Sequence, residues 1–196
     1  MFTGIISEIG TIISTDKLKG SSCFLKIRAP ITARKLKPSD SLSIDGACLT
    51  VTLKKEATFE VELIPETLKR TIANKYRKGT KVNIEQSLKA GERFHGHFLS
   101  GHVDFSGKII KMRRNGKAKI LAIEFPPVMK KYFCLKCSVA INGVSLTITR
   151  AGNNWFEINL IPFTQKETTL GASQKNDTVN VEIDLIARYL ESLLKQ

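Results

Sequence analysis

The sequence predicts an all-β chain that carries one small barrel twice and ends in a single helix. Three observations predict this class. The chain repeats itself at a constant offset of 97 residues, its apolar runs are rich in β-branched and aromatic residues with a period of two, and Asp-Gly and Asn-Gly pairs separate those runs.

The repeat covers most of both halves without a gap. "DGACLTV" at 45–51 returns as "NGVSLTI" at 142–148, "LIPET" at 63–67 as "LIPFT" at 160–164, and "VNIE" at 82–85 as "VNVE" at 179–182. A period of 97 residues is too long for a solenoid unit, so it indicates duplication of a whole domain. We therefore divide the chain into residues 1–97, residues 98–184 and a tail at 185–196.

Within each unit the signals are for short strands and tight turns. "CLTVTLKK", "TFEVELI", "KAKILAIEF" and "WFEINLI" are typical of strands, whereas "DG" at 45–46, "NG" at 142–143, "NG" at 115–116, "KKEAT" and "AGNNW" are typical of hairpin turns. Short helices are expected after Pro30 and Pro65 and after their counterparts Pro127 and Pro162. About six short strands in under ~100 residues favour a small closed or Greek-key barrel.

The tail "DLIARYLESLLKQ" has a helical period and no counterpart after the first unit. Asp184 is a candidate N-cap. The apolar stripe either packs on its own domain or meets copies of itself in an oligomer, and we favour the oligomer. The stripe comprises Leu185, Ile186, Tyr189, Leu190, Leu193 and Leu194.

Composition excludes several classes of protein. With 42% hydrophobic and 25% charged residues the chain is not disordered, and no run is long enough to span a membrane. We see no signal peptide and expect a cytoplasmic protein. The net charge of +13 would suit nucleic acid, but no aromatic residues interleave with the basic ones, so we expect no nucleic-acid partner and no membrane partner.

The four cysteines are expected to be reduced in a cytoplasmic chain. Cys134 and Cys137 form a single CxxC, which marks either a metal or redox site or a buried thiol. We interpret "YFCLKCSVAI" as a strand, in which residues three apart point to opposite faces, and so favour a buried thiol.

Small polar side chains recur beside the two repeated turns. Cys48 and Thr50 share one strand face, as Ser145 and Thr147 do in the second unit, so each unit presents either a solvated face or a binding wall. His95, His97 and His102 lie close in sequence and suggest either a metal site or a general base, and we favour the base. His102 stands where the first unit has Ile5. No Walker A, GxGxxG, HExxH or GxSxG motif is present in the sequence.

Together these residues resemble a known family. "MFTGII", "GACLTV", "ETLKRT", "GHFLSGHVD", "NGVSLTIT", "LIPFT" and "VNVEID" occur in the order and spacing of the riboflavin synthase α-chain family, and the resemblance covers essentially the whole chain. Two positions depart from the family pattern: His95 stands where a glycine is usual, and Phe163 replaces a polar residue.

The resemblance implies two six-stranded Greek-key barrels, each binding a lumazine, and a C-terminal helix that builds a homotrimer. It implies dismutation of two molecules of 6,7-dimethyl-8-ribityllumazine to riboflavin and 5-amino-6-(D-ribitylamino)uracil, without a metal or another cofactor. In the family the active site forms between the N-terminal barrel of one subunit and the C-terminal barrel of a neighbour. The alternative is a non-catalytic relative that binds a lumazine or flavin.

The resemblance also implies the site residues. We expect His102 to transfer protons, Cys48, Ser145 and Thr147 to assist, and Phe2 to shape the pocket. The first pocket is expected to use Gly4, Ile5, Ile6, Cys48, Leu49, Thr50, Glu62, Leu63, Ile64, Pro65, Glu66 and Thr67. The second is expected to use Gly101, His102, Val103, Lys136, Ser145, Leu146, Thr147, Asn159, Leu160, Ile161, Pro162, Phe163 and Thr164.

Overall fold

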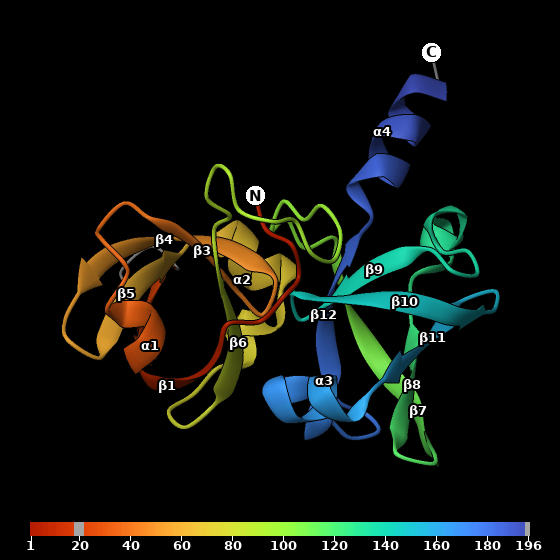
Figure 1. Cartoon of the computed structure of the whole chain (residues 1–196), viewed down its shortest axis with the longest axis horizontal. Coiled ribbons are helices and arrows are strands. Elements are labelled where there is room, and N and C mark those ends of the chain that lie inside the picture. Colours follow the sequence, from red (N-terminus) through yellow and green to blue (C-terminus); the bar gives the residue numbers. More distant parts are fainter. Residues whose placement is uncertain (18–21, 195–196) are drawn as a thin grey trace.

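The computed structural model describes residues 1–17 and 22–194 and folds them into two closed antiparallel barrels that lie side by side (Figure 1). The first barrel contains β1 (Glu8–Lys17), β2 (Cys23–Arg28), β3 (Ser41–Ile44), β4 (Ala47–Lys54), β5 (Thr58–Leu63) and β6 (Lys81–Gln86). The second contains β7 (Phe105–Asn115), β8 (Ala118–Glu124), β9 (Ser138–Ile141), β10 (Val144–Ala151), β11 (Trp155–Leu160) and β12 (Thr178–Ile183).

Both barrels have the same topology. The strand order around the first is β1-β2-β5-β4-β3-β6, and around the second it is β7-β8-β11-β10-β9-β12. Strands β3, β4 and β5 follow one another as hairpins, and β2 lies beside β5, which is a Greek key. The predicted fold class, two six-stranded Greek-key barrels with short helices and a C-terminal helix, is therefore confirmed.

Short helices fill the connections, as predicted from the prolines. Each barrel has one before its third strand and a pair before its last strand. In the first barrel they are α1 (Pro30–Ala33), α2 (Pro65–Arg70) and the 3-10 helix η1 (Ile72–Lys75). In the second they are the 3-10 helix η2 (Pro127–Tyr132), α3 (Pro162–Glu167) and the 3-10 helix η3 (Thr169–Gly171).

The predicted hairpin turns are present. Asp45 and Gly46 join β3 to β4 with φ of 45° and 83°, and Asn142 and Gly143 join β9 to β10 with φ of 46° and 75°. Positive φ at both central residues is the type I′ turn, whose twist matches that of the strands it joins.

The prediction for the CxxC segment is wrong. Cys134 and Cys137 do not lie in a strand but in a turn between η2 and β9, and they form a disulfide with their Cα atoms 5.4 Å apart. The "YFCLKC" letters carry β propensity, but Lys136 has a left-handed φ of 68°, which ends any strand there.

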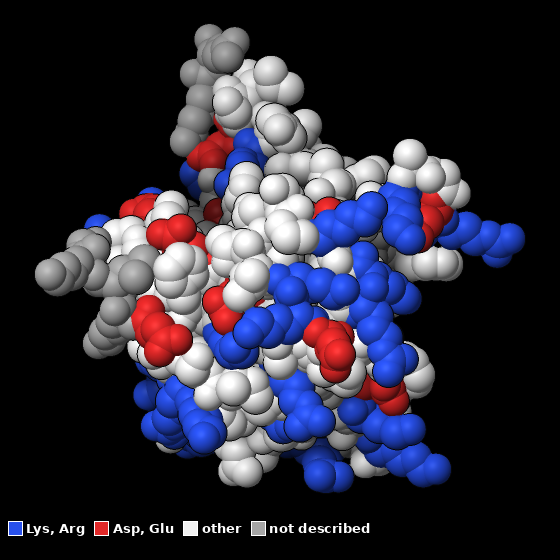
Figure 2. All heavy atoms as spheres, turned by 90° about the vertical axis from the view of Figure 1, so that its left-hand side faces the viewer, with Lys and Arg blue, Asp and Glu red and all other residues white. Residues whose placement is uncertain are grey.

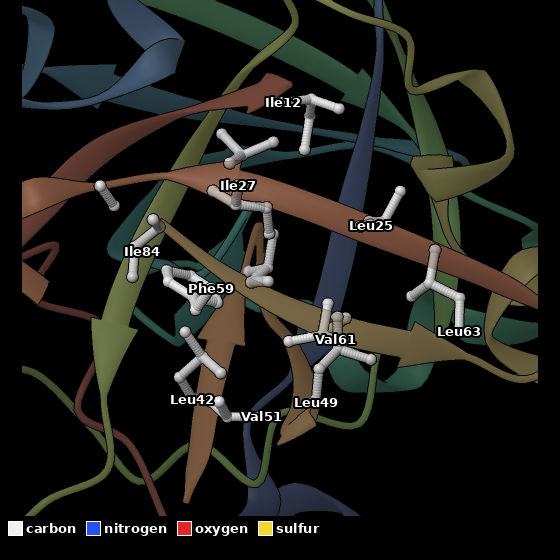
Figure 3. Close-up of a cluster of buried hydrophobic side chains, with 14 of the residues drawn as sticks. Ile12, Leu25, Ile27, Leu42, Leu49, Val51, Phe59, Val61, Leu63 and Ile84 are labelled. Atoms are coloured by element: carbon white, nitrogen blue, oxygen red, sulfur yellow. The ribbon is translucent and has the colours of Figure 1, made fainter. Parts of the chain in front are cut away.

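Each barrel has its own apolar interior. In the first, side chains from β1, β2, β4, β5 and β6 point inward and meet around Phe59, which is 1% exposed (Figure 3). In the second, the rings of Phe125, Phe133 and Phe156 lie within 4.6 to 5.9 Å of one another. Burial of this apolar surface is the main source of stability, at roughly 25 cal/mol per Å².

The two barrels meet along a local two-fold axis. Gly46 and Gly143 face each other so closely that a Cβ on Gly46 would lie 2.8 Å from the Gly143 nitrogen. The Asn83 amide donates to the Asn142 carbonyl at 2.9 Å, and its counterpart Asn180 donates to the Asp45 carbonyl at 2.7 Å. Buried reciprocal hydrogen bonds of this kind fix one orientation of the barrels.

Helix α4 (Leu185–Leu194) leaves the second barrel and extends away from both (Figure 1). The predicted N-cap is confirmed, because Asp184 Oδ1 accepts a hydrogen bond from the Ile186 amide at 2.9 Å. Arg188 donates to both carboxylate oxygens of Asp104 at 2.9 and 3.0 Å, which ties the helix to the second barrel. Beyond this contact the apolar stripe is exposed, with Leu193 at 67%.

The positive charge is spread over the surface. Figure 2, which looks onto the first-barrel side, shows lysine and arginine across much of that face with acidic residues among them. In the described part of the chain no helix is long and apolar enough to cross a membrane.

Candidate functional site

The segment that begins the chain crosses from the first barrel to the second. Glu85 on β6 accepts hydrogen bonds from the Thr3 and Gly4 amides at 2.7 and 2.9 Å, which anchors the segment on the first barrel. The Gly4 carbonyl then accepts from the Ser145 amide on β10 at 2.9 Å, and Ile6 packs on the core of the second barrel.

The counterpart segment crosses in the opposite direction. Glu182 on β12 accepts hydrogen bonds from the Ser100 and Gly101 amides at 2.8 and 3.2 Å. The Gly101 carbonyl accepts from the Cys48 amide on β4 at 2.8 Å, and Val103 packs in the core of the first barrel. These contacts differ from the predicted grouping of the segments: each barrel's polar strand is contacted by the glycine segment of the other unit.

Only glycine fits at these two contacts. Gly4 has φ of +81° and Gly101 has φ of +79°. A Cβ on Gly4 would lie 2.5 Å from the Ser145 Cβ, and a Cβ on Gly101 would lie 2.5 Å from the Cys48 Cβ. Cys48 and Ser145 are thus held in equivalent places beside a backbone that cannot carry a side chain.

Strand pairing places two further pairs of predicted site residues next to each other. Val51 lies opposite Val61, and continuing this register places Thr50 beside Glu62, both exposed, on neighbouring strands β4 and β5. Ile148 lies opposite Ile158, which in the same way places Thr147 beside Asn159. One barrel therefore presents a carboxylate where the other presents an amide.

The residues after β5 and β11 form an apolar rim on each barrel. Ile64 and Ile161 precede α2 and α3 and are 54% and 58% exposed, and Phe163 is 71% exposed. Ile5, which lies between Gly4 and Ile6 in the crossing segment, is 51% exposed. Exposed isoleucine and phenylalanine side chains gathered beside polar strand ends are typical of a surface that another molecule covers.

The rim differs in charge between the barrels. Glu66 forms an ion pair with Arg70 at 2.5 Å, and this hydrogen bond lowers the pKa of the exposed Glu66 carboxyl. Phe163 occupies the equivalent position on α3 and carries no charge. The rim of the first barrel therefore carries an ion pair at the position where the rim of the second barrel carries an exposed phenylalanine.

Several predicted binding residues belong to the cores. Leu49, Leu63 and Leu160 are at most 6% exposed, so only their backbone can face a ligand. Leu146 is half-buried against the second core. Pro65 and Pro162 begin α2 and α3, and the carbonyls of Thr67 and Thr164 accept hydrogen bonds from the Thr71 and Thr168 hydroxyls at 2.6 and 2.7 Å.

Phe2 lies behind the site and not in an open pocket. It is fully buried, exchanges two backbone hydrogen bonds with Leu99 at 2.8 and 3.1 Å, and packs with Cys48. Burial raises the pKa of the Cys48 thiol, which disfavours the thiolate that a nucleophile would need.

The three histidines differ in exposure. His95 and His102 are exposed, whereas His97 is 8% exposed and points into the junction between the barrels. Among residues 1–17 and 22–194 no group of three or more His, Cys, Asp or Glu side chains is arranged to hold a metal ion. His102 follows Gly101 and so lies at the first barrel, beside the strand that carries Cys48.

His97 contacts Ser145 on the second barrel directly, and the sequence did not predict this contact. Its Nδ1 lies 2.6 Å from Ser145 Oγ, and its buried Nε2 has no hydrogen-bond partner in the described part of the chain. Burial lowers the pKa of His97, so the ring is neutral near neutral pH. A neutral imidazole at this distance can accept a proton from the Ser145 hydroxyl. His97 is the last residue of the first unit, and the position 97 residues later is Leu194 in the tail, so the repeat could not reveal it.

Comparison with known proteins agrees with this architecture. A family model of the lumazine binding domain matches residues 3–87 and 100–184. The riboflavin synthase of Bacillus subtilis is 39% identical over 194 residues, 99% of this chain and 90% of that protein. That of Photobacterium phosphoreum is 38% identical over 99% of this chain and 89% of its own length. That of Mycobacterium tuberculosis is 35% identical over 100% of this chain and 98% of its own length.

Solved structures share the fold. The structure of LumP complexed with 6,7-dimethyl-8-(1'-D-ribityl) lumazine has a TM-score of 0.83 and 23% identity, covering 93% of this chain and 98% of that one. The structure of LumP complexed with riboflavin has a TM-score of 0.86 and 22% identity, covering 93% and 99%. With its two lumazine-binding units and relatives that match it from end to end, the chain belongs to the riboflavin synthase family.

Proposed function

We propose that this chain catalyses the dismutation of two molecules of 6,7-dimethyl-8-ribityllumazine to riboflavin and 5-amino-6-(D-ribitylamino)uracil, the last step of riboflavin biosynthesis. The observation that carries the proposal is the presence of two equivalent lumazine-binding units in one chain whose relatives, matched over nearly their whole length, are riboflavin synthases.

Duplication of the domain suits the chemistry. The reaction consumes two copies of one substrate, and two like pockets can hold both in position so that their encounter is no longer bimolecular. One lumazine passes a four-carbon unit to the other. The two products together contain all the atoms of the two substrates, so no external oxidant or reductant is consumed.

The differences between the pockets suit unequal roles for the two substrates. The first pocket combines Cys48, Thr50, Glu62 and His102. In the lumazine the 7-methyl protons are acidic because the ring delocalises the anion, so a modest base near neutral pKa is sufficient. We propose that His102 transfers protons at this pocket and that Cys48 assists as a polar thiol.

The second pocket combines Ser145, Thr147, Asn159 and Lys136, with His97 behind Ser145. We infer that His97 carries its ring proton on Nε2, so that Nδ1 accepts the Ser145 hydroxyl proton across 2.6 Å. Ser145 Oγ then becomes a stronger acceptor for a proton of the bound ring system. The Lys136 ammonium adds a positive charge that would stabilise an anionic ring.

We also propose the assembly that the family resemblance implies. In it, residues 1–97 and 98–184 are the two binding barrels and 185–196 is a helix that builds a homotrimer. The exposed stripe on α4 supports this, since Tyr189 and Leu193 are 61% and 67% exposed in the single chain. An active site between the first barrel of one subunit and the second of a neighbour would cover the apolar rims. A cytoplasmic location stays a prediction from the sequence.

The test is to mix the purified protein with the lumazine and follow the fluorescence of riboflavin. We expect one riboflavin and one diaminouracil for every two lumazines consumed. The alternative is that the chain is a non-catalytic lumazine or flavin binder. The chain shares its fold with the LumP structures at 22–23% identity. Ligand binding without any riboflavin formation would establish that alternative and reject the enzyme.

A further inference from the structure

The turn that carries Lys136 is closed by a covalent bond. It connects η2 to β9, and Cys134 and Cys137 on either side of Leu135 and Lys136 form a disulfide. Cys134 is exposed, whereas Cys137 is half-buried against the second core. Neither cysteine takes part in the chemistry proposed above.

The first barrel contains the same turn without cysteines. Residues Lys37 and Asp40 stand at the positions of Cys134 and Cys137, and Ser39 stands at the position of Lys136. Ser39 and Lys136 both have left-handed φ, 75° and 68°.

The backbone hydrogen bonds of the two turns agree one by one. The Ser39 amide donates to the Val51 carbonyl at 2.9 Å, as that of Lys136 does to Ile148 at 2.8 Å. The Asp40 amide donates to the Lys37 carbonyl at 3.1 Å, and the Cys137 amide donates to that of Cys134 at 3.2 Å.

The two turns differ in the interaction that joins their first and last residues. In the first turn Asp40 Oδ2 accepts a hydrogen bond from the Lys37 amide at 2.7 Å. This is a side chain holding the amide three residues before it. In the second turn Cys137 replaces that aspartate and cannot accept in the same way, and the disulfide takes over the closure.

We propose that Cys134 and Cys137 form a reversible thiol–disulfide site, and that its oxidised form holds the turn and with it Lys136. A dithiol reductant attacks the exposed Cys134 sulfur, the bond between the two sulfurs breaks, and Cys137 leaves as a thiolate and takes up a proton. The second thiol of the reductant resolves the mixed disulfide. Two electrons and two protons pass to the protein, and the reductant leaves as a disulfide.

Reduction breaks the disulfide that joins Cys134 to Cys137, and no other interaction between these two side chains replaces it. The reduced turn keeps its backbone hydrogen bonds but lacks the carboxylate that closes the first turn. The turn around Lys136 then has to be ordered when the ligand binds, and ordering a turn together with its side chain weakens binding roughly 2- to 10-fold. This effect on Lys136 rests on the proposed function, whereas the thiol chemistry does not.

The first test needs no activity. The folded protein is equilibrated in buffers of reduced and oxidised dithiothreitol, its thiols are alkylated, and the modified cysteines are identified by mass. We expect Cys134 and Cys137 to become alkylated together as the buffer becomes reducing, while Cys48 and Cys23 do not follow that titration. Two free thiols at every buffer ratio, or a disulfide that stays intact while the protein is folded, would overturn the proposal.

The second test compares KM for the lumazine in the two redox states. We expect the reduced protein and the Cys134→Ser/Cys137→Ser variant to share a KM about 2- to 10-fold above that of the oxidised protein. Cys134→Ser/Cys137→Asp transfers the closure of the first barrel and is expected to keep the low KM whatever the redox buffer. In a Lys136→Ala background the redox difference is expected to vanish.

Equal KM in both redox states, or a Cys137→Asp variant that behaves like the serine variant, would reject the link to Lys136. If no variant converts lumazine at all, the proposed function has failed. The alkylation experiment still decides whether the thiol–disulfide site exists.

Discussion

At the scale of single residues, His97 is the side chain whose contacts say most about the chemistry. Its Nδ1 lies 2.6 Å from Ser145 Oγ, and Ser145 is itself fixed by the Gly4 carbonyl. We expect His97→Ala to lower kcat by roughly 10²- to 10⁴-fold, the usual effect of losing an acid–base group. Because burial lowers the pKa of His97, the limb of the pH profile that belongs to His97 is expected at a pH below the usual histidine range.

The variants to compare with His97→Ala are Ser145→Ala and the double variant His97→Ala/Ser145→Ala. If the two side chains act as a unit, removing both costs little more than removing either, so steady-state kinetics measure a coupling between them. Additive losses, or a His97→Ala enzyme with normal turnover, would contradict the pairing. His97→Gln adds a second readout, since it is expected to remove the limb of the pH profile that belongs to His97.

Asp45 is a residue whose protonation affects stability. Burial raises the pKa of its carboxyl from 3.8 to about 7, even though Tyr76 and the Asn83 amide donate to it at 2.6 and 2.8 Å. Its folded pKa is above its unfolded pKa. The stabilisation is therefore complete below about pH 4 and is lost as pH rises to about 7, at roughly 1.4 kcal/mol per pKa unit.

We expect Asp45→Asn to remove this slope. The second barrel provides the precedent: Asn142 Oδ1 accepts from the Asn180 amide at 2.7 Å without a charge. Urea unfolding near pH 5 and near pH 8 measures the slope. The exposed Asp16→Asn is the control and is expected to keep the wild-type slope. A variant at Asp45 with the same pH dependence as wild type would show that the carboxyl is ionised in both states.

At the scale of elements, the two crossing segments determine how each pocket is built. Gly4→Ala introduces a Cβ 2.6 Å from the Ser145 nitrogen at a φ of +81°. The left-handed backbone alone costs about 1–2 kcal/mol in a residue with a Cβ. Because the neighbouring atoms are backbone and cannot turn away, we expect a larger loss of unfolding free energy and weaker lumazine binding at the second pocket.

Gly79→Ala is the matched control for that variant. Gly79 has a φ of +92°, but nothing lies within 4 Å of the place its Cβ would occupy. It is expected to show the backbone cost alone and normal turnover. Equal destabilisation of the two variants in urea unfolding would mean that the close approach of Gly4 to Ser145 contributes nothing.

The elements also show how far sequence reasoning reached. The strands, the Asp45-Gly46 and Asn142-Gly143 turns and the short helices follow from local signals, because turn type and residue pattern are encoded within a few neighbours. The exchange of the Gly4 and Gly101 segments was not predictable, because a repeat identifies equivalent positions but not which copy they contact. The hydrogen bonds of Glu85 and Glu182 that direct the exchange join residues 81 and 82 positions away.

The lack of information about distant contacts in a local pattern also explains two further differences between prediction and structure. His97 is brought to Ser145 from 48 residues away. No periodicity predicts that contact, because the position 97 residues after His97 is Leu194 in the tail and not a residue of the second barrel. The composition of "YFCLKC" predicts a strand at Cys134, whereas its counterpart "LKPSD" at 36–40, with Pro38, indicates a turn.

At the scale of the whole molecule, the question is which barrels face each other across the bound pair of lumazines. Within one chain the barrels meet at the Gly46 and Gly143 turns, and the apolar rims with Ile64 and Phe163 remain exposed. A neighbouring subunit held by α4 would cover those rims and bring a first and a second pocket together.

This arrangement predicts complementation between two inactive proteins. His102→Ala disables the first pocket and Ser145→Ala disables the second, so neither protein turns over lumazine well by itself. In trimers reassembled from an equal mixture, about a quarter of the interfaces pair an intact first pocket with an intact second pocket. We therefore expect up to about a quarter of the wild-type rate to return.

A site formed within one chain predicts the opposite result, since every subunit in the mixture carries one defective pocket. Adding Leu190→Glu to both proteins places a charge on the exposed stripe of α4, and sedimentation is expected to show monomers. The mixture then stays inactive although each chain remains folded, because the recovered activity depends on the helix that joins the subunits. Recovery without trimers would show that the two pockets meet without the helix, whereas no recovery in reassembled trimers would place both pockets of one active site in a single chain.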